Sequence, residues 1–521
     1  MFENEYTWGK AVANNKTDEF HAQFEDSVKK VSNELEKEYP IIINGKEIFL
    51  DSKFTVKSPS NTNLILGKFP LSTKEDTLSA IKSAKNAFLE WAHTPYQTRA
   101  SIFKDCADQF SKDKFYLSAL MSFENGKNRL EAMGDVDEAI DFMRFYAEQL
   151  EINEGFSKET KHPNPNEKTR SILKPFGVWG IISPFNFPLA ISIGMTTGAV
   201  ITGNTAILKP ASDTPISSFK FVKAIYKKLP NGAINFITGP GHVVGKTLIQ
   251  SPDVDGIAFT GSQEVGMEGY QTFTEKSVKP FISEMGGKNP TIVTESADIE
   301  KSTDGVLRAA YGYGGQKCSA CSRVYVHKNI ADKFLKKLIE KTNSLQIGLP
   351  WKKNTFLGPL INESAQKKFK DAIELAKKDG EIIQGGNVLE NSDYKNGYYV
   401  EPTIITKLPR NHRLMKEELF VPILCVDQFD NFDEAIKLAN ETEYGLTAGI
   451  FTENKKELEE FFDKIQAGTV YANRAASATT SALVSSQPFV GWKNSGSSGK
   501  GAGGVNYLQQ FMRSQTQTRC A

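Results

Sequence analysis

Four short apolar segments in the middle of the chain, each followed by a stretch of helical character, place the strongest constraint on the fold. They cover residues 178–183, 205–209, 233–238 and 256–260. Strands that alternate with helices are typical of a parallel α/β sheet. A second alternating region runs from residue 284 to about 470, with helices expected near 331–343 and 364–379. A chain of 521 residues is too long for one simple core, so we expect two or three domains.

Residues 177–201 are largely apolar and could be mistaken for a membrane span. Pro184, Asn186 and Pro188 fall inside this stretch. A spanning helix would have to accommodate two prolines and a polar amide, whereas a buried strand followed by a buried helix does not. We therefore expect a strand and a helix here, and no membrane association.

The first hundred residues carry clear local signals. Residues 1–37 are charged and of helical character, which predicts an N-terminal arm. Residues 41–46 read as a strand that enters an Asn-Gly turn, a strong hairpin signal. Ser72, with Glu75 three residues later, forms a capping box and predicts a helix over residues 72–91. Its apolar face is expected to carry Leu78, Ile81, Ala84, Phe88 and Trp91.

Two further segments are expected to lie outside the main body. Residues 157–170 are polar and contain prolines, which indicates an exposed loop or hairpin. The tail after Pro488 is rich in glycine and then becomes strand-like over residues 507–515.

Composition excludes several classes of function. The 63 basic and 62 acidic residues nearly cancel, so no bulk field attracts nucleic acid or an anionic membrane. The five cysteines are few and odd in number, which disfavours a disulfide framework and suggests a reducing, cytoplasmic setting. The acidic start of the chain has no apolar core and does not resemble a secretory signal.

Cys318 and Glu284 are the leading candidates for chemistry. Cys318 lies among small and polar residues just after a glycine pair, and Glu284 precedes a glycine pair of its own. A thiol nucleophile with a separate general base recurs in covalent catalysis. The alternative for a lone cysteine is an inert core residue.

The C-x-x-C spacing of Cys318 and Cys321 does not predict a metal site. A zinc site would need partner ligands, but there is no second C-x-x-C and the six histidines are scattered. Cys321 could pair with Cys318 on oxidation, although a small packing residue is the favoured interpretation. We expect no metal.

Polar residues at the ends of the predicted strands suit a cofactor. Ser262 and Gly266 follow a strand and open a helix, where free N–H groups favour a pyrophosphate; an ordinary serine N-cap is the alternative. Lys209 ends another strand, where it either reaches a ligand in the crevice or lies solvated on the surface.

Two other polar groups have competing interpretations. Asn186, set between aromatic residues and prolines, could donate to a developing oxyanion or merely satisfy loop carbonyls. Glu417 and Glu418 precede a strand and are either a solvated pair or acceptors for ribose hydroxyls.

Six motifs, in this order and over essentially the whole chain, resemble those of the aldehyde dehydrogenase superfamily. They are P-F-N-F-P at 184–188, L-K-P-A at 208–211, F-T-G-S at 259–262 with Gly266, E-M-G-G-K at 284–288, G-Q-K-C at 315–318 and E-E-L-F at 417–420. The resemblance implies an α/β fold with a Rossmann-type cofactor domain, an α/β catalytic domain and a β-hairpin oligomerisation extension. The implied boundaries are an arm at 1–37, a cofactor domain at 38–155 and 175–283, a catalytic domain at 284–480, and an oligomerisation hairpin and tail at 156–174 and 500–521.

The resemblance also assigns roles to residues. Cys318 would attack an aldehyde, Asn186 and the Cys318 N–H would hold the oxyanion, and Glu284 would activate water to hydrolyse the thioester. Lys317 and the nicotinamide ring would help to form the thiolate. The implied cofactor-binding residues are Ser183, Pro184, Phe185, Lys209, Ser212, Ser262, Gly266, Glu418 and Phe420. The implied substrate-binding residues are Phe187, Lys317, Ser319, Ser481, Ala482 and Phe489.

The implied cofactor is NAD. Many relatives carry a glutamate where Ser212 stands, and that glutamate repels a 2′-phosphate, so the neutral Ser212 leaves NADP open. A small-molecule aldehyde is the expected substrate, and a homo-oligomer is the expected assembly.

Within the superfamily the chain is most similar to the 1-pyrroline-5-carboxylate dehydrogenases, which oxidise glutamate semialdehyde to glutamate. The similar stretches are residues 38–45, 135–142, 315–320, 487–489 and 503–508. Ser481 and Ser485 stand where that family usually has glycines, and Val490 breaks its usual F-G-G. These departures leave another semialdehyde, of succinate or 2-oxoglutarate, as the alternative substrate. A non-catalytic scaffold with this fold is the alternative of another class, and intact Cys318, Glu284 and Asn186 argue against it.

Overall fold

The computed structural model describes residues 1–521 except for 1–2, 4–5, 162, 392, 476–482 and 521. A seven-stranded sheet in the first half of the chain has the order β12-β11-β8-β9-β10-β2-β3. Its strands from β12 to β10 are parallel, and β2 and β3 join the edge in antiparallel fashion. The predicted parallel sheet is therefore confirmed. The strands are β2 (Ile41–Ile43), β3 (Lys46–Ile48), β8 (Val178–Ile182), β9 (Thr205–Lys209), β10 (Ile234–Phe236), β11 (Gly256–Thr260) and β12 (Phe281–Glu284).

Helices cover both faces of this sheet, which explains why its strands are continuously apolar. Ala206 and Leu208 of β9 belong to one buried cluster, whereas Ile207 belongs to another that includes Ile81 and Ala84. The first face is covered by α4 (Tyr96–Asn125), α5 (Arg129–Ile152), α6 (Ala190–Ile201) and α7 (Pro215–Ile225). The second is covered by α3 (Lys74–His93), α8 (Lys246–Gln250) and α9 (Gln263–Thr274).

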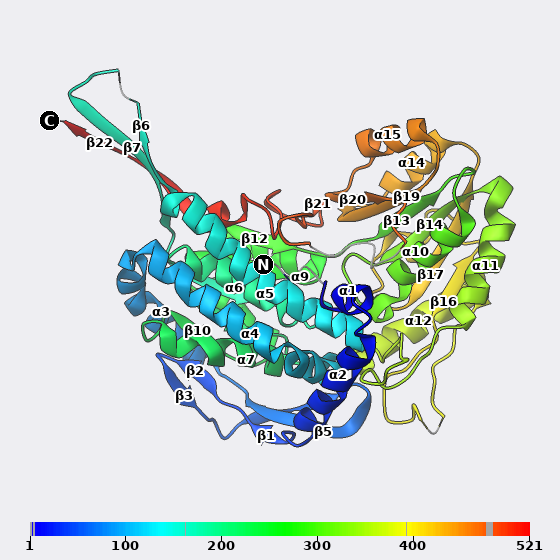
Figure 1. The fold of residues 1–521 in the computed structure, drawn as a ribbon, viewed down its shortest axis with the longest axis horizontal. Coiled ribbons are helices and arrows are strands. Elements are labelled where there is room, and N and C mark those ends of the chain that lie inside the picture. Colours follow the sequence, from blue (N-terminus) through cyan, green and yellow to red (C-terminus); the bar gives the residue numbers. More distant parts are fainter. Residues whose placement is uncertain (1–2, 4–5, 162, 392, 476–482, 521) are drawn as a thin grey trace.

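A second seven-stranded sheet, with the order β15-β16-β17-β14-β13-β19-β20, forms the other lobe in Figure 1. β15 is antiparallel to β16, and the remaining neighbours are parallel. Its strands are β13 (Asn289–Val293), β14 (Cys321–His327), β15 (Glu381–Gln384), β16 (Thr403–Thr406), β17 (Ile423–Phe429), β19 (Thr447–Phe451) and β20 (Thr469–Ala472). Its helices are α10 (Ile299–Tyr311), α11 (Ala331–Asn343), α12 (Glu363–Asp379), α13 (Arg413–Lys416), α14 (Phe432–Asn440) and α15 (Lys455–Lys464). The helices predicted near 331–343 and 364–379 are thus confirmed.

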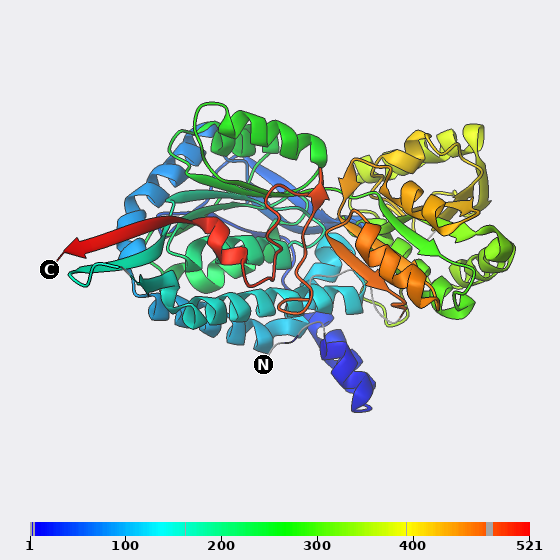
Figure 2. The same ribbon diagram turned by 90° about the horizontal axis from the view of Figure 1, so that it is seen from above.

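A three-stranded sheet projects from the body, as Figures 1 and 2 show. It has the order β22-β7-β6 and consists of β6 (Ser157–Thr160), β7 (Glu167–Pro175) and β22 (Met512–Cys520). The predicted hairpin is therefore confirmed, but the predicted strand over 507–515 is wrong at its start. Tyr507–Phe511 is a 3₁₀ turn, because Tyr507, Leu508 and Phe511 pack into the core on one side of the turn.

The remaining elements complete the N-terminal lobe and its edges. The arm folds as two helices, as predicted: α1 (Tyr6–Ala13) and α2 (Thr17–Ser32), with Phe24 reaching the core. A small sheet has the order β1-β5-β4, with β1 (Lys37–Glu38), β4 (Lys53–Ser58) and β5 (Asn61–Pro70); β18 (Tyr444–Gly445) pairs with β21 (Trp492–Lys493). In the described part of the chain, no helix is long and apolar enough to cross a membrane.

The capping prediction for α3 is wrong by one residue. Thr73, not Ser72, is the N-cap, and it exchanges hydrogen bonds with Asp76 rather than Glu75. The Ser72 N–H is already committed to the carbonyl of Thr238. Leu78 is also exposed rather than packed, with 43% of its surface accessible.

Two turns contain residues with a left-handed backbone. Asn44 and Gly45 have φ of 54° and 71°, as a tight β2–β3 hairpin requires. Ser485 has φ of 71°, in the region that glycine adopts most readily. A serine is therefore held in a conformation that favours glycine.

Replacing Ser485 with glycine is expected to raise the free energy of unfolding by about 0.5–1 kcal/mol, since the left-handed penalty of an L-residue slightly exceeds the entropy lost by a glycine. Urea titration would measure the change. Ser486→Gly is the matched control: this neighbouring exposed serine lacks the positive φ, so its replacement is expected to be neutral or destabilising. Equal effects of the two substitutions would contradict the strain argument.

Candidate active site

The predicted nucleophile lies on a tight turn between α10 and β14. After α10 the chain forms a 3₁₀ turn at Gly312–Gly315, in which Tyr313, Gly314 and Gly315 have φ of 48°, 63° and 67°. Cys318 follows and is partly exposed. On its other side, the Asn289 amide donates hydrogen bonds to the carbonyls of Cys318 and Ala320, at 2.6 and 2.9 Å. The backbone around the thiol is therefore fixed by glycine-type geometry and by a buried amide.

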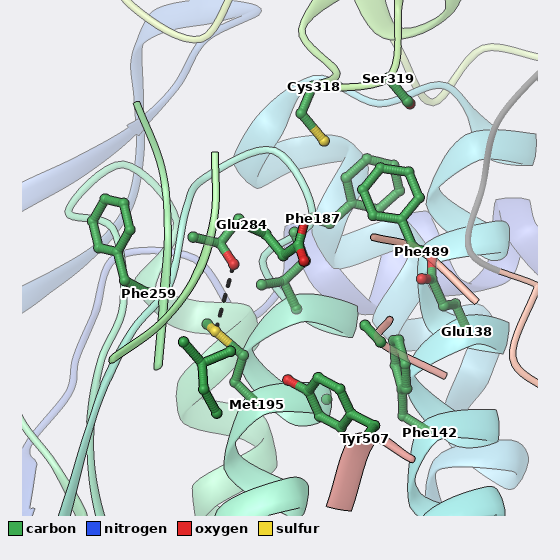
Figure 3. A pocket seen from close by; sticks show the side chains of 15 residues that line it. Glu138, Phe142, Phe187, Met195, Phe259, Glu284, Cys318, Ser319, Phe489 and Tyr507 are labelled. Carbon is green, nitrogen blue, oxygen red and sulfur yellow. Dashed lines mark hydrogen bonds between the residues drawn. The ribbon is translucent and has the colours of Figure 1, made fainter. Parts of the chain in front are cut away.

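Cys318 opens into a cavity that Figure 3 shows from close by. Glu284, Phe187, Ser319 and Phe489 also line it, so five of the predicted site residues share one cavity. Its walls are mostly apolar, and the rings of Phe187 and Phe489 lie between the thiol and the floor of the cavity (Figure 3). Such a cavity suits a small organic substrate with one reactive polar group.

Glu284 is the last residue of β12, where its surroundings orient the carboxyl and raise its pKa. Its Oε2 accepts a hydrogen bond from the Gly491 N–H at 3.0 Å. Burial raises the pKa of this carboxyl to about 8. A carboxylate with its pKa near the working pH can take a proton from water, which is what a general base requires.

The Lys317 side chain does not lie where we expected. Its Nζ pairs with Glu131 at 2.9 Å, and Lys317 is not among the residues that line the cavity. Burial raises the pKa of the Cys318 thiol, and the carboxylates of Glu418 and Glu284 raise it further. Lys317 is therefore bound to Glu131 rather than directed into the cavity.

The turn between β8 and α6 carries the predicted oxyanion donor. Asn186 is 3% exposed, so the amide is buried as expected, while its neighbour Phe187 faces the cavity. Ser183 accepts a hydrogen bond from the Ser192 hydroxyl at 2.7 Å, which anchors the turn to α6. Pro184 lies between Ser183 and Asn186 in the sequence. The oxyanion role of Asn186 stays a prediction.

Two of the predicted cofactor residues follow β9. Lys209 is 5% exposed, so the surface-lysine alternative is wrong. Its Nζ donates to the Pro210 carbonyl at 2.8 Å, and burial lowers the pKa of the amine to about 8. Ser212 is exposed beyond the strand, with its hydroxyl 3.5 Å from the carbonyl of Gly239.

The turn after β11 confirms the serine N-cap interpretation of its motif, and its pyrophosphate role stays a prediction. Ser262 is the N-cap of α9 and accepts from the Val265 N–H at 3.5 Å, while its side chain stays exposed. Gly266 is buried against the next loop: a Cβ there would lie 2.5 Å from the Met285 sulfur. The glycine thus allows close packing of α9, and the N-terminus of the helix faces outward.

Glu418 and Phe420 lie opposite the β8–α6 turn. Glu418 accepts from the Gly287 N–H at 2.9 Å, and burial raises the pKa of its carboxyl to about 7. Its neighbour Glu417 is instead paired with Arg413 at the surface. Phe420 packs edge-on against Phe185, with ring centroids 5.7 Å apart. Glu418 is half-buried and Glu417 is exposed, so Glu418 is the acceptor that lies against the Gly287 loop.

The cavity also contains a carboxylate that we did not predict. Glu138 of α5 lines it, together with Phe142 one turn later and Tyr507 from the tail. Glu138 is an acidic residue in a part of α5 where nearly all neighbouring residues are buried, and this setting is what marks it as unusual. Ser481 and Ala482, predicted to hold the substrate, lie outside the described residues.

Cys321 fits the packing interpretation better than a redox role. It starts β14, is 3% exposed and accepts from the Thr291 hydroxyl at 3.2 Å. All five cysteines are free thiols. Within the ranges that the structure describes, no group of three or more metal-binding side chains is assembled.

Comparison with known proteins identifies the family. The sequence profile described as "Aldehyde dehydrogenase family" matches residues 49–517. The chain belongs to this family. Among aldehyde dehydrogenases, it is 39% identical over 500 residues to the 1-pyrroline-5-carboxylate dehydrogenase of Geobacillus sp. (strain WCH70), covering 95% of each chain. It is 37% identical to 1-pyrroline-5-carboxylate dehydrogenase 2 of Bacillus subtilis (strain 168), again covering 95% of each.

A solved aldehyde dehydrogenase has the same fold. The crystal structure of 1-pyrroline-5-carboxylate dehydrogenase from Thermus with bound NAD superposes with a TM-score of 0.92 at 33% identity and covers 97% of both chains. The α/β aldehyde dehydrogenase fold inferred from the motifs is thus confirmed.

Proposed function

We propose that this chain oxidises L-glutamate 5-semialdehyde, the open form of 1-pyrroline-5-carboxylate, to L-glutamate, with NAD as the hydride acceptor. The observation that carries the proposal is the shared cavity of Cys318, Glu284 and Glu138. The first two groups supply a nucleophile and a base, and the third supplies a negative charge suited to the substrate's ammonium group. Similarity to 1-pyrroline-5-carboxylate dehydrogenases over 95% of the chain supports the same substrate.

The residues of the chain divide the chemistry into two steps. Cys318 Sγ attacks the aldehyde carbon, and the oxyanion that forms is held by the Asn186 amide and the Cys318 N–H. NAD, which Lys209, Glu418 and the N-terminus of α9 would hold, would supply the acceptor for the hydride that leaves the thiohemiacetal. Glu284 then takes a proton from water, and the hydroxide attacks the thioester on Cys318, which releases the acid and regenerates the thiol.

The cofactor residues fit a dinucleotide. Lys209 is buried and Glu418 is half-buried, each has few internal partners, and both can bind ribose hydroxyls. The N-terminus of α9, with Ser262, offers free N–H groups to the pyrophosphate. Ser183, Pro184 and Phe185, together with Phe420, would border the nicotinamide ring. Because Ser212 is neutral and exposed, NADP is the second cofactor to test.

The substrate would lie between the rings of Phe187 and Phe489. Ser319, with the backbone of Ser481 and Ala482, would hold the α-carboxylate, and Glu138 would face the ammonium group. The second candidate substrate is a semialdehyde that lacks the amine, namely that of succinate or 2-oxoglutarate. Ser485, in the loop before Phe489, is the feature that favours this alternative.

The three-stranded sheet that projects from the body is the proposed site of contact between copies of the chain. β22 and β6 are its edge strands, and an edge that leaves the body can pair with a second copy of this chain. We infer a homo-oligomer built from dimers, in the cytoplasm, where free thiols persist.

The test is reduction of NAD and NADP by the purified protein with 1-pyrroline-5-carboxylate, the two rival semialdehydes and simple aliphatic aldehydes. We expect kcat/KM for 1-pyrroline-5-carboxylate to exceed the rest by about tenfold or more, equivalent to about 1.4 kcal/mol of transition-state binding.

The variant Glu138→Gln sharpens this experiment. It should lower kcat/KM for the amine-bearing substrate and leave that for succinate semialdehyde nearly unchanged. A parent that prefers another aldehyde would overturn the substrate, and equal losses on both substrates would overturn the role of Glu138.

A further inference from the structure

The catalytic groups belong to different parts of the molecule. Glu284 ends β12 of the first sheet, and Asn186 lies on the turn between β8 and α6 of the same sheet. Cys318 lies on the turn before β14 of the second sheet. Nucleophilic attack requires the reacting atoms to be placed to well within about 1 Å. The Cys318 thiol must therefore be tied to the lobe that holds Glu284 and Asn186.

On its C-terminal side, the Cys318 turn is held by its own lobe. Asn289 of β13 binds the carbonyls of Cys318 and Ala320, and its Oδ1 in turn accepts from the Thr447 N–H at 3.0 Å. These contacts fix the turn on the second sheet. Because Asn289 follows Glu284 by only five residues, these contacts also relate the turn to the end of β12, but none of them reaches the turn that carries Asn186.

On its N-terminal side, the turn is bound by residues of the other lobe. Glu131, in the first turn of α5, accepts from the Tyr313 N–H at 3.0 Å through Oε2 and from Lys317 Nζ at 2.9 Å through Oε1. The side chains of Glu131 and Lys317 are 18% and 7% exposed. A charged hydrogen bond that is shielded from water is stronger than one at the surface.

The turn needs such support because its backbone is unusual. Tyr313 has φ of 48° and precedes two further left-handed residues, a conformation that persists where the surroundings impose it. The Tyr313 hydroxyl donates to the Asn125 carbonyl at 2.8 Å, at the end of α4. Both ends of this tyrosine are thus bound to the α4–α5 connection.

We propose that Glu131 is a positioning residue that sets Cys318 against Asn186 and Glu284 by binding Tyr313 and Lys317 together. The role rests on the proposed function, because it assumes that Cys318 is the nucleophile. In this proposal, the contacts of Glu131 with Tyr313 and Lys317 form a clamp. Lys317 helps to position Cys318 through this clamp and does not bind the substrate. The segment Asn125–Glu131 serves as the link between the lobes at the nucleophile.

The experiment uses Glu131→Gln in the full chain. The amide keeps one acceptor oxygen and turns a donor toward Tyr313 N–H or Lys317 Nζ, so one of the two bonds is lost. We expect kcat to fall about tenfold or more with KM for NAD changed less than twofold. Glu148→Gln is the matched control, since Glu148 is an exposed carboxylate of the same helix.

A second readout does not depend on turnover. The rate of Cys318 alkylation by iodoacetamide, followed by peptide mapping to separate it from the exposed Cys520, reports how the thiol is presented. Glu131→Gln should change this rate about threefold or more at constant pH, while the melting temperature stays close to that of the control. If the parent fails to oxidise 1-pyrroline-5-carboxylate, the proposed function fails, but the alkylation rates still test the clamp.

A double variant tests the shared contact. Glu131→Gln with Lys317→Met should lose less than the product of the two single losses, because both substitutions weaken the same set of contacts around Glu131. Multiplicative losses, a kcat for Glu131→Gln within twofold of the parent, or an equal loss in Glu148→Gln would overturn the proposal. If Glu131→Gln does not fold, the same two measurements, kcat and the rate of Cys318 alkylation, are made on Lys317→Met and decide whether the proposal holds.

Discussion

Replacing Cys318 with alanine is expected to reduce turnover by about 10⁴-fold or more, the loss that follows removal of a covalent nucleophile. The cavity is lined by no other cysteine among the described residues, so no second thiol can take over the attack. Cofactor binding should be unchanged, because Lys209, Ser262 and Glu418 are untouched. Stopped assays of NAD reduction and calorimetric titration of NAD would measure the two effects separately.

Cys321→Ala is the control for this variant. It removes a thiol three residues away that packs against Thr291 and opens onto the core rather than onto the cavity. We expect nearly normal turnover and a loss of stability of about 1–2 kcal/mol. Substantial remaining activity in Cys318→Ala, or an equal loss in Cys321→Ala, would mean that the nucleophile has been misassigned.

Local and periodic signals predicted most of the fold. The apolar runs of β8, β9 and β11 and the helices α6, α11 and α12 are encoded by residues close together in sequence. The cap of α3 was misplaced because Ser72 and Thr73 each have an acidic residue three positions later, and only the contact with Thr238 decides between them. The 3₁₀ turn at Tyr507–Phe511 was missed although its buried residues follow a helical spacing.

The candidate site was predicted where motifs carry it and missed where distant side chains meet. Cys318, Glu284, Phe187 and Phe489 share a cavity, as the order of the motifs implies. The partner of Lys317 lies 186 residues away on α5, and no pattern near Lys317 points to it. Glu138 reaches the cavity from the same helix. Such pairings depend on how two lobes dock, which one sequence does not state.

Replacing Glu284 with glutamine is expected to arrest the enzyme after its first hydride transfer. Without a base to activate water, the thioester on Cys318 persists, and the steady-state rate should fall by about 10²–10⁴-fold. One NADH should form per active site in a burst. A simple aliphatic aldehyde that the parent turns over is the better substrate for this assay, because it has no amine that could attack the thioester.

The pH dependence of the parent gives the same residue an independent signature. Only the ionised Glu284 carboxylate can accept a proton from water, and burial raises its pKa to about 8. The rate of thioester hydrolysis should therefore rise with pH, about tenfold per unit well below pH 8, and level off above it. Glu284→Gln should lack this rise. A parent whose hydrolysis rate does not change between pH 6 and 9, or a variant that forms no acyl adduct on Cys318 by mass spectrometry, would remove Glu284 from the hydrolytic step.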